Sequence, residues 1–143
     1  MSVIVKENVQ ETATSFIAPY VEAKYNAQHQ VVEYKWIGHV KDQDAYTAFE
    51  KILNLCKKHK AKNIIADVTA FQGGSVQAAK WSNDVWSGQL AEAGIQKLAV
   101  NLPKSAFGEF SLKISLGEKF LAMMKVEKFT SLEQAYIWLA KKD

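Results

Sequence analysis

The sequence predicts a single α/β domain whose mixed, mostly parallel β-sheet begins with an antiparallel hairpin. Three observations lead to this prediction. A length of 143 residues fits one domain. Segments rich in β-branched and aromatic residues alternate with segments whose apolar residues recur at helical spacing, as in strands joined by crossover helices. The first two strand-like segments are separated only by a short turn, which is typical of a hairpin.

Composition restricts the classes of function. The net charge of +3 is mild and does not suggest the dense basic face of a nucleic-acid-binding protein. No apolar run approaches the roughly 18 residues of a membrane span, and residues 1–10 lack a signal-peptide pattern. The single cysteine, Cys56, excludes an internal disulfide and fits a reducing compartment. We therefore expect a cytoplasmic protein with no nucleic-acid partner and no transmembrane segment.

The N-terminal part of the chain divides into a weakly patterned stretch and a hairpin. Residues 1–18 are predicted to be a loose arm or an extra edge strand, and residues 19–143 to form the domain. The hairpin strands are predicted at Pro19–Tyr25, which alternates polar and apolar residues, and at Gln30–Val40, which is rich in Val, Tyr, Trp and Ile. The turn-forming residues 26–29 join them.

The rest of the domain alternates helices and strands. Helices are expected at about residues 42–60, 75–93 and 105–121, the third broken or kinked at Gly117, and after the capping box Thr130-Ser131-Leu132-Glu133. Short strands are expected at Asn63–Asp67, Lys97–Leu102 and Val126–Phe129. The predicted order is therefore β-β-α-β-α-β-α-β-α, with right-handed crossovers between parallel strands.

The best place to look for function is the junction between the strand ending at Asp67 and the helix starting at Ser75, because ligands and partners of open α/β sheets bind outside the carboxyl ends of strands. Asp67 could bind a partner's donor group, accept a proton or hold a cation there, or it could bond backbone amides of the following loop. Gly73, Gly74 and Ser75 open a helix, where free amides favour an anion. Ser75 is therefore either a plain N-cap or a docking and phospho-acceptor position.

The helix after this junction carries a second candidate surface. At roughly 100° per residue, one side should face the sheet, and it contains Val76, Ala79, Trp86, Leu90 and Ala93. Trp81 and Val85, with Ala78, fall away from that side and are expected to be partly exposed unless the third helix or the N-terminal arm covers them. An exposed tryptophan beside a valine would be an anchor for a partner, or for a homodimer.

The third helix is expected to turn its apolar residues inward. Its predicted inner face consists of Phe107, Phe110, Ile114 and Leu121. A closed cavity between this helix and the sheet, lined by Phe107, Phe110, Ile114 and Phe120, would be the mark of a small-ligand carrier.

No catalytic residue, metal or cofactor is predicted. The sequence lacks the glycine-rich nucleotide loops, the H-E-x-x-H and C-x-x-C patterns and the G-x-S-x-G elbow. Cys56 and His59 have the i, i+3 spacing of two ligands, but a metal site needs three or four ligands and no others cluster nearby. Cys56 is interpreted instead as part of the apolar stripe of its helix, and His59 as part of the end of that helix.

Four segments resemble the STAS superfamily of anti-sigma-factor antagonists, and more closely the small SpoIIAA-like (STAS/SEC14-type) proteins of bacteria. They are Tyr34-Lys35-Trp36-Ile37-Gly38, Ile64-Ile65-Ala66-Asp67, Leu98-Ala99-Val100 before Pro103, and Phe129-Thr130-Ser131-Leu132-Glu133-Gln134-Ala135-Tyr136-Ile137-Trp138-Leu139. The similarity covers about residues 20–141.

The resemblance implies a non-enzymatic module that binds a protein partner. In antagonists of this type a regulatory serine lies where the strand's loop meets the second helix. Ser75 is its nearest match by position, and Asp67 and Thr69 match the Asp and Ser that end the strand. The chain departs from the family in having Gly73-Gly74-Ser75 where an Asp-Ser pair is expected.

Three hypotheses for function follow. The first is a regulatory or scaffolding domain that binds an unidentified protein through Asp67, Thr69, Gly73, Gly74 and Ser75, with Trp81 and Val85 as apolar anchors. The second, suggested by the SEC14-type side of the resemblance, is a carrier or sensor of a small apolar or anionic ligand. The third and least favoured is an enzyme that uses Asp67 with one histidine.

Overall fold

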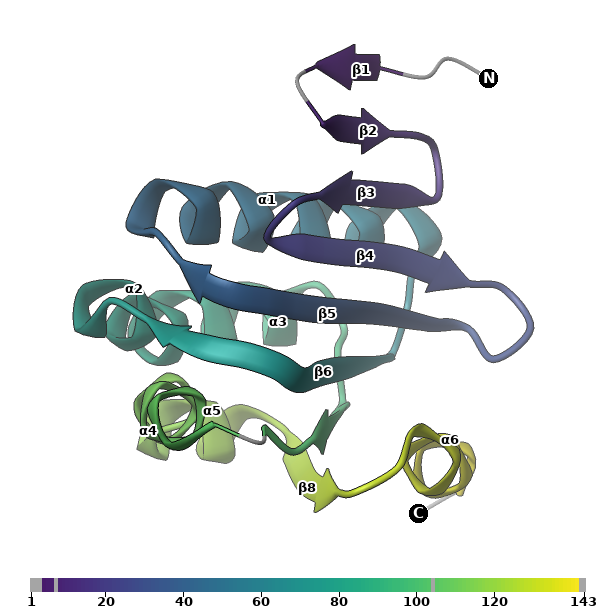
Figure 1. Ribbon diagram of the computed structural model, residues 1–143. Helices are drawn as coiled ribbons and strands as arrows, with labels where there is room; N and C mark the ends of the chain where they lie inside the picture. Colours follow the sequence, from purple (N-terminus) through teal and green to yellow (C-terminus); the bar gives the residue numbers. More distant parts are fainter. Residues whose placement is uncertain (1–3, 7, 104, 142–143) are drawn as a thin grey trace.

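The structure is a computed structural model that describes residues 4–6, 8–103 and 105–141. Eight strands form one sheet in the order β1-β2-β3-β4-β5-β6-β7-β8 (Figure 1). The strands are β1 (Ile4–Lys6), β2 (Val9–Glu11), β3 (Ser15–Ala18), β4 (Val21–Asn26), β5 (Val31–Val40), β6 (Asn63–Gly74), β7 (Lys97–Asn101) and β8 (Lys125–Phe129). The helices are α1 (Asp42–His59), α2 (Val76–Trp81), the π-helical turn η1 (Ser82–Trp86), α3 (Ser87–Glu92), α4 (Ala106–Ser115), α5 (Glu118–Met123) and α6 (Leu132–Ala140).

The sheet has an antiparallel half and a parallel half. Neighbouring strands from β1 to β5 are antiparallel, and those from β5 to β8 are parallel. From β4 onward the strands and crossovers follow the predicted order, so the predicted α/β fold is confirmed. The strands β1 to β3 precede it and pair with the same sheet, while the division of the chain at residue 18 stays a prediction.

The two faces of the sheet are covered unequally. The helices α1 to α3 pack on one face, whereas α6 packs on the other (Figure 1). Alternation along β5 explains this arrangement, because successive side chains point to opposite faces. Val32 and Tyr34 enter the core under the crossover helices, while Val31 packs with Ala135 and Leu139 of α6.

Strand β6 is much longer than predicted. Asp67 was expected to end it, but β6 continues to Gly74 and stays paired with β5 as far as Val40. Two register shifts, between Lys35 and Ile37 and between Gly38 and His39 of β5, place an extra β6 residue at each point. Bulges of this kind let a strand bend without losing its partner. Asp67 therefore lies in the middle of β6, at the level where the shorter β7 ends at Asn101.

Three serine caps set the starts of helices, as Ncap hydroxyls commonly do. Ser75 accepts a hydrogen bond from the Ala78 amide (3.0 Å), and Ser105 accepts one from the Gly108 amide (3.0 Å). The cap of α6 is Ser131, which accepts from the Gln134 amide. The predicted capping box was therefore displaced by one residue, because Ser131 rather than Thr130 takes the Ncap position.

The second crossover helix consists of α2, η1 and α3, which follow one another without a gap. Its π turn, η1, changes which side of the helix is buried. A π turn holds an extra residue, so the side facing the sheet differs before and after it. Ala78 is 5% exposed and Val76 is 47% exposed, the reverse of the expectation from an uninterrupted helix. Trp86 and Leu90, which follow the shift, are buried as predicted.

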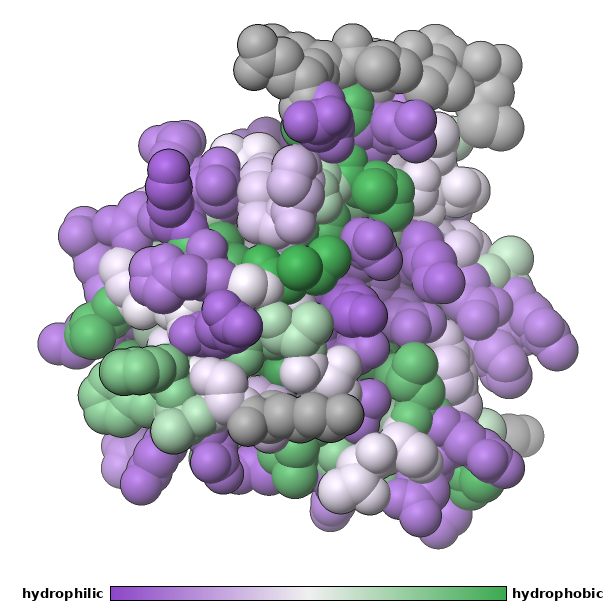
Figure 2. Space-filling view, viewed as in Figure 1, coloured by the Kyte–Doolittle hydropathy of each residue, from purple (hydrophilic) through white to green (hydrophobic). Residues whose placement is uncertain are grey.

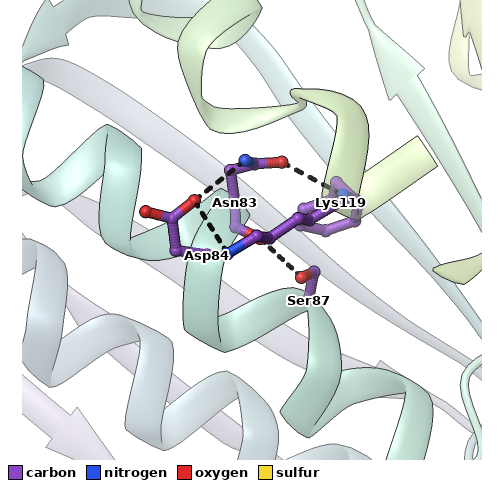
Figure 3. A network of polar contacts seen from close by, with 5 residues as sticks. Asn83, Asp84, Ser87 and Lys119 are labelled. Carbon is purple, nitrogen blue, oxygen red and sulfur yellow. Dashed lines mark hydrogen bonds and ion pairs between the residues drawn. The ribbon is translucent and has the colours of Figure 1, made fainter. Parts of the chain in front are cut away.

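The π turn also supplies a cap for α5 (Figure 3). The Ncap residue of α5, Gly117, has no side chain to offer. The side chain of Asn83 takes its place, with Oδ1 accepting a hydrogen bond from the Phe120 amide at 3.0 Å. The Asn83 amide nitrogen donates in turn to Asp84 (3.1 Å), and Asp84 lies 3.8 Å from the Lys119 ammonium. This contact attaches α5 to the second crossover helix.

Replacing Asn83 by alanine is expected to lower the free energy of unfolding by about 1 kcal/mol, the usual effect of losing a helix cap. Urea denaturation would measure the loss. The matched control is Gln89→Ala, an exposed change in the following helix, for which little effect is expected. Equal stability of the two variants would show that Asn83 is not an effective cap.

Candidate functional site

At the junction of β6 and α2, the structure places Gly73, Gly74 and Ser75 in succession. Gly73 has a φ of 106°, a conformation that favours glycine. Ser75 is half-buried and its hydroxyl caps α2. The cap role predicted for Ser75 is therefore confirmed, and its roles in docking and phosphorylation stay predictions.

Helix α4 covers part of this junction. The Gly74 amide donates to the Ser111 hydroxyl at 3.1 Å, and Gly73 is buried. A Cβ built on Gly73 would lie 3.2 Å from the Cβ of Phe107, and one built on Gly108 would lie 2.4 Å from the Phe71 carbonyl oxygen. The backbones of α4 and β6 are therefore in direct contact, and α4 covers this part of the junction.

Asp67 and Thr69 form a local motif within β6 rather than an open acidic site. The Asp67 side chain is 7% exposed. Its Oδ1 accepts hydrogen bonds from the amide (3.1 Å) and the hydroxyl (2.7 Å) of Thr69, across the first register shift. This agrees with the alternative in which the Asp67 carboxylate accepts hydrogen bonds from backbone amides of the residues that follow it. Asn101, its register partner on β7, is 6% exposed, and its Oδ1 has no hydrogen-bond partner in the described part of the chain.

Trp81 is covered by α1, an element that the sequence analysis did not consider. Its ring stacks on Phe49 with centroids 5.6 Å apart and meets Tyr46 edge-on at 5.5 Å. Trp81 is therefore half-buried. Val85, one turn further along, is 40% exposed. These contacts assign the Trp81 ring largely to holding the second crossover helix against α1.

A small hollow lies beneath α2 and α4. Its volume is about 60 Å³, space for about two water molecules. Aromatic rings and serine hydroxyls line much of it, among them Tyr34, Trp36, Phe49, Phe71, Trp86, Phe120, Ser75, Ser82, Ser111 and Ser115. This hollow is not the cavity named as the mark of a small-ligand carrier, because only Phe120 of the four residues named for that cavity is in the lining.

The predicted inner face of the third helix was wrong, because α4 turns the other way. Phe107 is 77% exposed and Phe110 is 59% exposed, whereas Gly108 and Ser111 pack inward. Leu121 of α5 is also exposed, at 57%. Close backbone contact explains the inversion, because only small residues fit where α4 meets β6. A signal was present in the sequence as Gly108, Ser111 and Ser115, three small residues on one side of the helix.

The inversion leaves an apolar surface next to the junction. We call the exposed Phe107 and Phe110 and the half-buried Ile114, which share one side of the helix at i, i+3 and i+7, the α4 strip. Val76, 47% exposed, begins α2 beside it. Figure 2 shows hydrophobic side chains gathered in this region, at the lower left where α2 and α4 lie in Figure 1. Exposed aromatic clusters of this kind mark interaction sites.

Cys56, His59 and Asp67, the reactive groups considered from the sequence, are each buried or engaged in structural contacts. Burial raises the pKa of the Cys56 thiol to about 12, so Cys56 is a poor nucleophile. The His59 ring stacks on Tyr25 and its Nε2 lies 2.9 Å from the Ala13 carbonyl oxygen. Hydrogen bonds to the Asp67 carboxylate come only from Thr69 among the described residues. No group of three or more His, Cys, Asp or Glu residues that could hold a metal ion occurs there either.

A single mixed sheet with crossover helices on one face and a closing helix on the other defines an α/β domain of the STAS type. A family model described as SpoIIAA-like matches residues 31–140, and the chain belongs to that family. The resemblance noted from the sequence is thereby confirmed. Members of the family are generally non-enzymatic regulators.

The comparison with curated proteins and that with solved structures each found no match. Among the described residues, no helix is both long and apolar enough to cross a membrane.

Proposed function

We propose that this domain is a non-enzymatic regulatory module that binds a protein partner at the β6–α2 junction, through Gly74 and Ser75 together with the α4 strip and Val76, with the buried Gly73 shaping the junction. The observation that carries the proposal is the exposure of Phe107 and Phe110. Aromatic residues dominate the binding energy of protein interfaces when a partner desolvates them. Membership of a family of regulators supports the same conclusion.

The orientation of α4 supports this assignment. The short approach between Gly108 and Phe71 and the hydrogen bond from Gly74 to Ser111 hold the helix in its inverted orientation. Phe107 and Phe110 cannot turn inward without breaking both contacts. The phenyl groups are therefore held toward solvent by a specific packing arrangement, as expected for residues that serve a partner.

The other predicted site residues receive different roles in this proposal. Val85 is exposed on the second crossover helix, and Trp81 acts mainly by fixing α2 against α1. Asp67 and Thr69 shape β6 at its first register shift. A phosphate on Ser75 would place negative charge at the start of α2 and next to α4, where it would alter the binding surface directly.

The carrier alternative has less support in the geometry. Ligand pockets usually exceed roughly 300 Å³, and the hollow beneath α4 measures about 60 Å³. A small-ligand carrier would require α4 to move away from β6, against the contacts of Gly108 and Ser111.

Exchanging both phenylalanines of the strip for serine, as Phe107→Ser with Phe110→Ser, is expected to abolish partner binding and leave the thermal midpoint nearly unchanged. Both side chains are exposed, so little core packing is lost. The measurement is quantitative capture of proteins from a native host extract on immobilised chain, compared between the variant and the unchanged protein.

The matched control is Leu121→Ser with Met123→Ser, which removes two exposed apolar side chains from α5 instead. A partner retained by the unchanged protein and by this control, but lost by the phenylalanine variant, would support the proposal. Equal retention by all three proteins would contradict it.

A further inference from the structure

We propose that the groove between α1 and the second crossover helix is a binding site for a small quaternary ammonium compound, a cation of the choline type. The groove has a volume of about 420 Å³ and is lined by Tyr46, Glu50, Leu53, Trp81 and Gln89. This volume falls in the usual range of small-molecule sites. None of the five residues belongs to the α4 strip or to the β6–α2 junction, so the inference is independent of the proposed partner surface.

Helical spacing brings the α1 residues of the groove together. Tyr46, Glu50 and Leu53 follow one another at i, i+4 and i+7 and therefore share one side of α1. Leu53 is buried, Tyr46 and Trp81 are half-buried, and Glu50 and Gln89 are exposed. The groove therefore combines an apolar floor, two aromatic walls and a polar rim.

The two aromatic walls meet nearly at a right angle. The ring planes of Tyr46 and Trp81 are inclined at 80°, with centroids 5.5 Å apart. Phe49 stacks on the Trp81 ring and holds it in place. A cation in the corner between the two walls would face π surface from both rings, an interaction that is strongest for tryptophan. A quaternary ammonium group has no N–H to donate, so it is recognised by π surfaces and methyl contacts such as Leu53 provides.

The charge at the rim selects a cation. Among the described residues the Glu50 carboxylate forms no ion pair or hydrogen bond. Lys51, its neighbour in sequence, pairs instead with Glu11 at 2.8 Å. The carboxylate would therefore attract a positive ligand in the corner, and it would repel an anion.

No lysine of the described chain occupies the corner. The lysines that lie over aromatic rings there are Lys51, over Phe16, and Lys97, over Trp138. A cation that enters the groove therefore does not have to displace an ammonium group of the protein from the rings.

The surroundings of the groove favour a small molecule over a side chain of a protein partner. A protein interface needs an apolar centre around its anchor. None of the large apolar side chains that are exposed in the described part of the chain lines this groove. The exposed lining residues, Glu50 and Gln89, are polar.

Titration with choline chloride at constant ionic strength tests the site. A small ligand at a partly exposed cation–π site should bind weakly, with a dissociation constant of roughly 0.1–10 mM. The measurement is the nitrogen–proton NMR spectrum of the indole groups, in which Trp81→Phe identifies the Trp81 signal by its disappearance. The Trp81 signal should shift in a saturable manner, whereas the signal of Trp138 should not move.

The neutral carbon analogue of choline separates charge from shape. In this compound a tert-butyl group replaces the trimethylammonium group, so size and apolar surface are kept and the positive charge is lost. It should bind at least about ten-fold more weakly than choline, since both the π surfaces and Glu50 act on the charge.

A charge-neutral variant tests the role of the rim. Glu50→Gln should weaken choline binding by roughly three- to ten-fold without affecting the fold, because the side chain is exposed. The matched control is Glu127→Gln, which removes the same charge from an exposed position of β8 outside the groove. The control should bind choline as the unchanged protein does.

Several results would overturn the inference. They are the absence of a saturable shift at Trp81, equal affinity for choline and its neutral analogue, and equal weakening by the two glutamine variants. A short peptide containing trimethyllysine provides the remaining comparison. If it bound at least about ten-fold more tightly than choline, the groove would serve a modified protein rather than a small molecule, and the proposal would be wrong.

Discussion

Replacing Trp86 by alanine is expected to lower the free energy of unfolding by about 3–5 kcal/mol, the largest effect among the changes considered. Trp86 is 2% exposed and its ring contacts the rings of Tyr34, Phe49 and Phe120. Its indole nitrogen donates to the Phe49 carbonyl oxygen at 3.0 Å. The substitution would enlarge the hollow beside Trp86 and remove a link between the π turn and α1. Urea denaturation monitored by circular dichroism would measure the loss.

The companion variant Trp86→Phe separates packing from hydrogen bonding. It keeps an aromatic ring in the core but has no donor for Phe49, so a smaller loss of about 1–2 kcal/mol is expected. This variant also keeps the measurement useful if the alanine variant fails to fold. Similar losses in the two variants would show that the hydrogen bond, and not the ring contacts, accounts for the effect.

Gly108→Ala is expected to destabilise the protein by about 1–3 kcal/mol, as overpacked substitutions do. The new methyl group would lie 2.4 Å from the Phe71 carbonyl oxygen and 3.2 Å from the Pro103 Cβ. Either α4 or β6 must shift, and neither is a flexible side chain. The shift should also loosen the hydrogen bond from Gly74 to Ser111. Faster hydrogen exchange at the Gly74 amide would reveal this, together with the lowered unfolding free energy.

Gly88→Ala is the matched control for this change. Gly88 is also a helical glycine, in α3, and no atom lies within 4 Å of a Cβ built there. Alanine suits a helix better than glycine, so this variant should gain roughly 0.5–1 kcal/mol. A stabilised Gly108→Ala variant would mean that α4 does not depend on close contact with β6.

Residue patterns on single elements predicted much of the fold. The β-branched and aromatic run in β5, the apolar stripe of α1 and the serine caps at Ser75 and Ser105 each depend on neighbours close in the chain. Such local signals persist in the folded protein because the same short-range interactions operate there. The shift of the α6 cap from Thr130 to Ser131 is within the ordinary uncertainty of helix boundaries.

The length of β6 was missed because its second half is set by pairing. The stretch from Val68 to Gly74 contains glycines and lacks a regular alternation, so it resembles a loop in sequence. Hydrogen bonds to the long β5 keep it extended, with bulges absorbing the extra residues. Asp67 and Ser75 therefore do not meet at one junction as predicted, because seven residues of β6 lie between them.

The orientation of α4 was predicted wrongly for a related reason. Periodicity identifies an apolar side of a helix, and the ordinary assumption buries that side. In this protein the distance between the α4 and β6 backbones excludes large residues, so Gly108 and Ser111 face inward and the phenylalanines face outward. Trp81 similarly found its cover in α1, a contact between elements distant in sequence.

The amino-acid order alone determined the SpoIIAA-like architecture, the alternation of strands with crossover helices and the start of α2 at Ser75, since these depend on short-range preferences and on the burial of apolar periodic residues. Only the tertiary structure decided which surface is displayed. The direct contact of α4 with β6 turns Phe107 and Phe110 toward solvent. The phase change at the π turn decides which residues of the second crossover helix are buried. The distance between two backbones, which no single segment encodes, selected the face of α4 that is exposed to solvent.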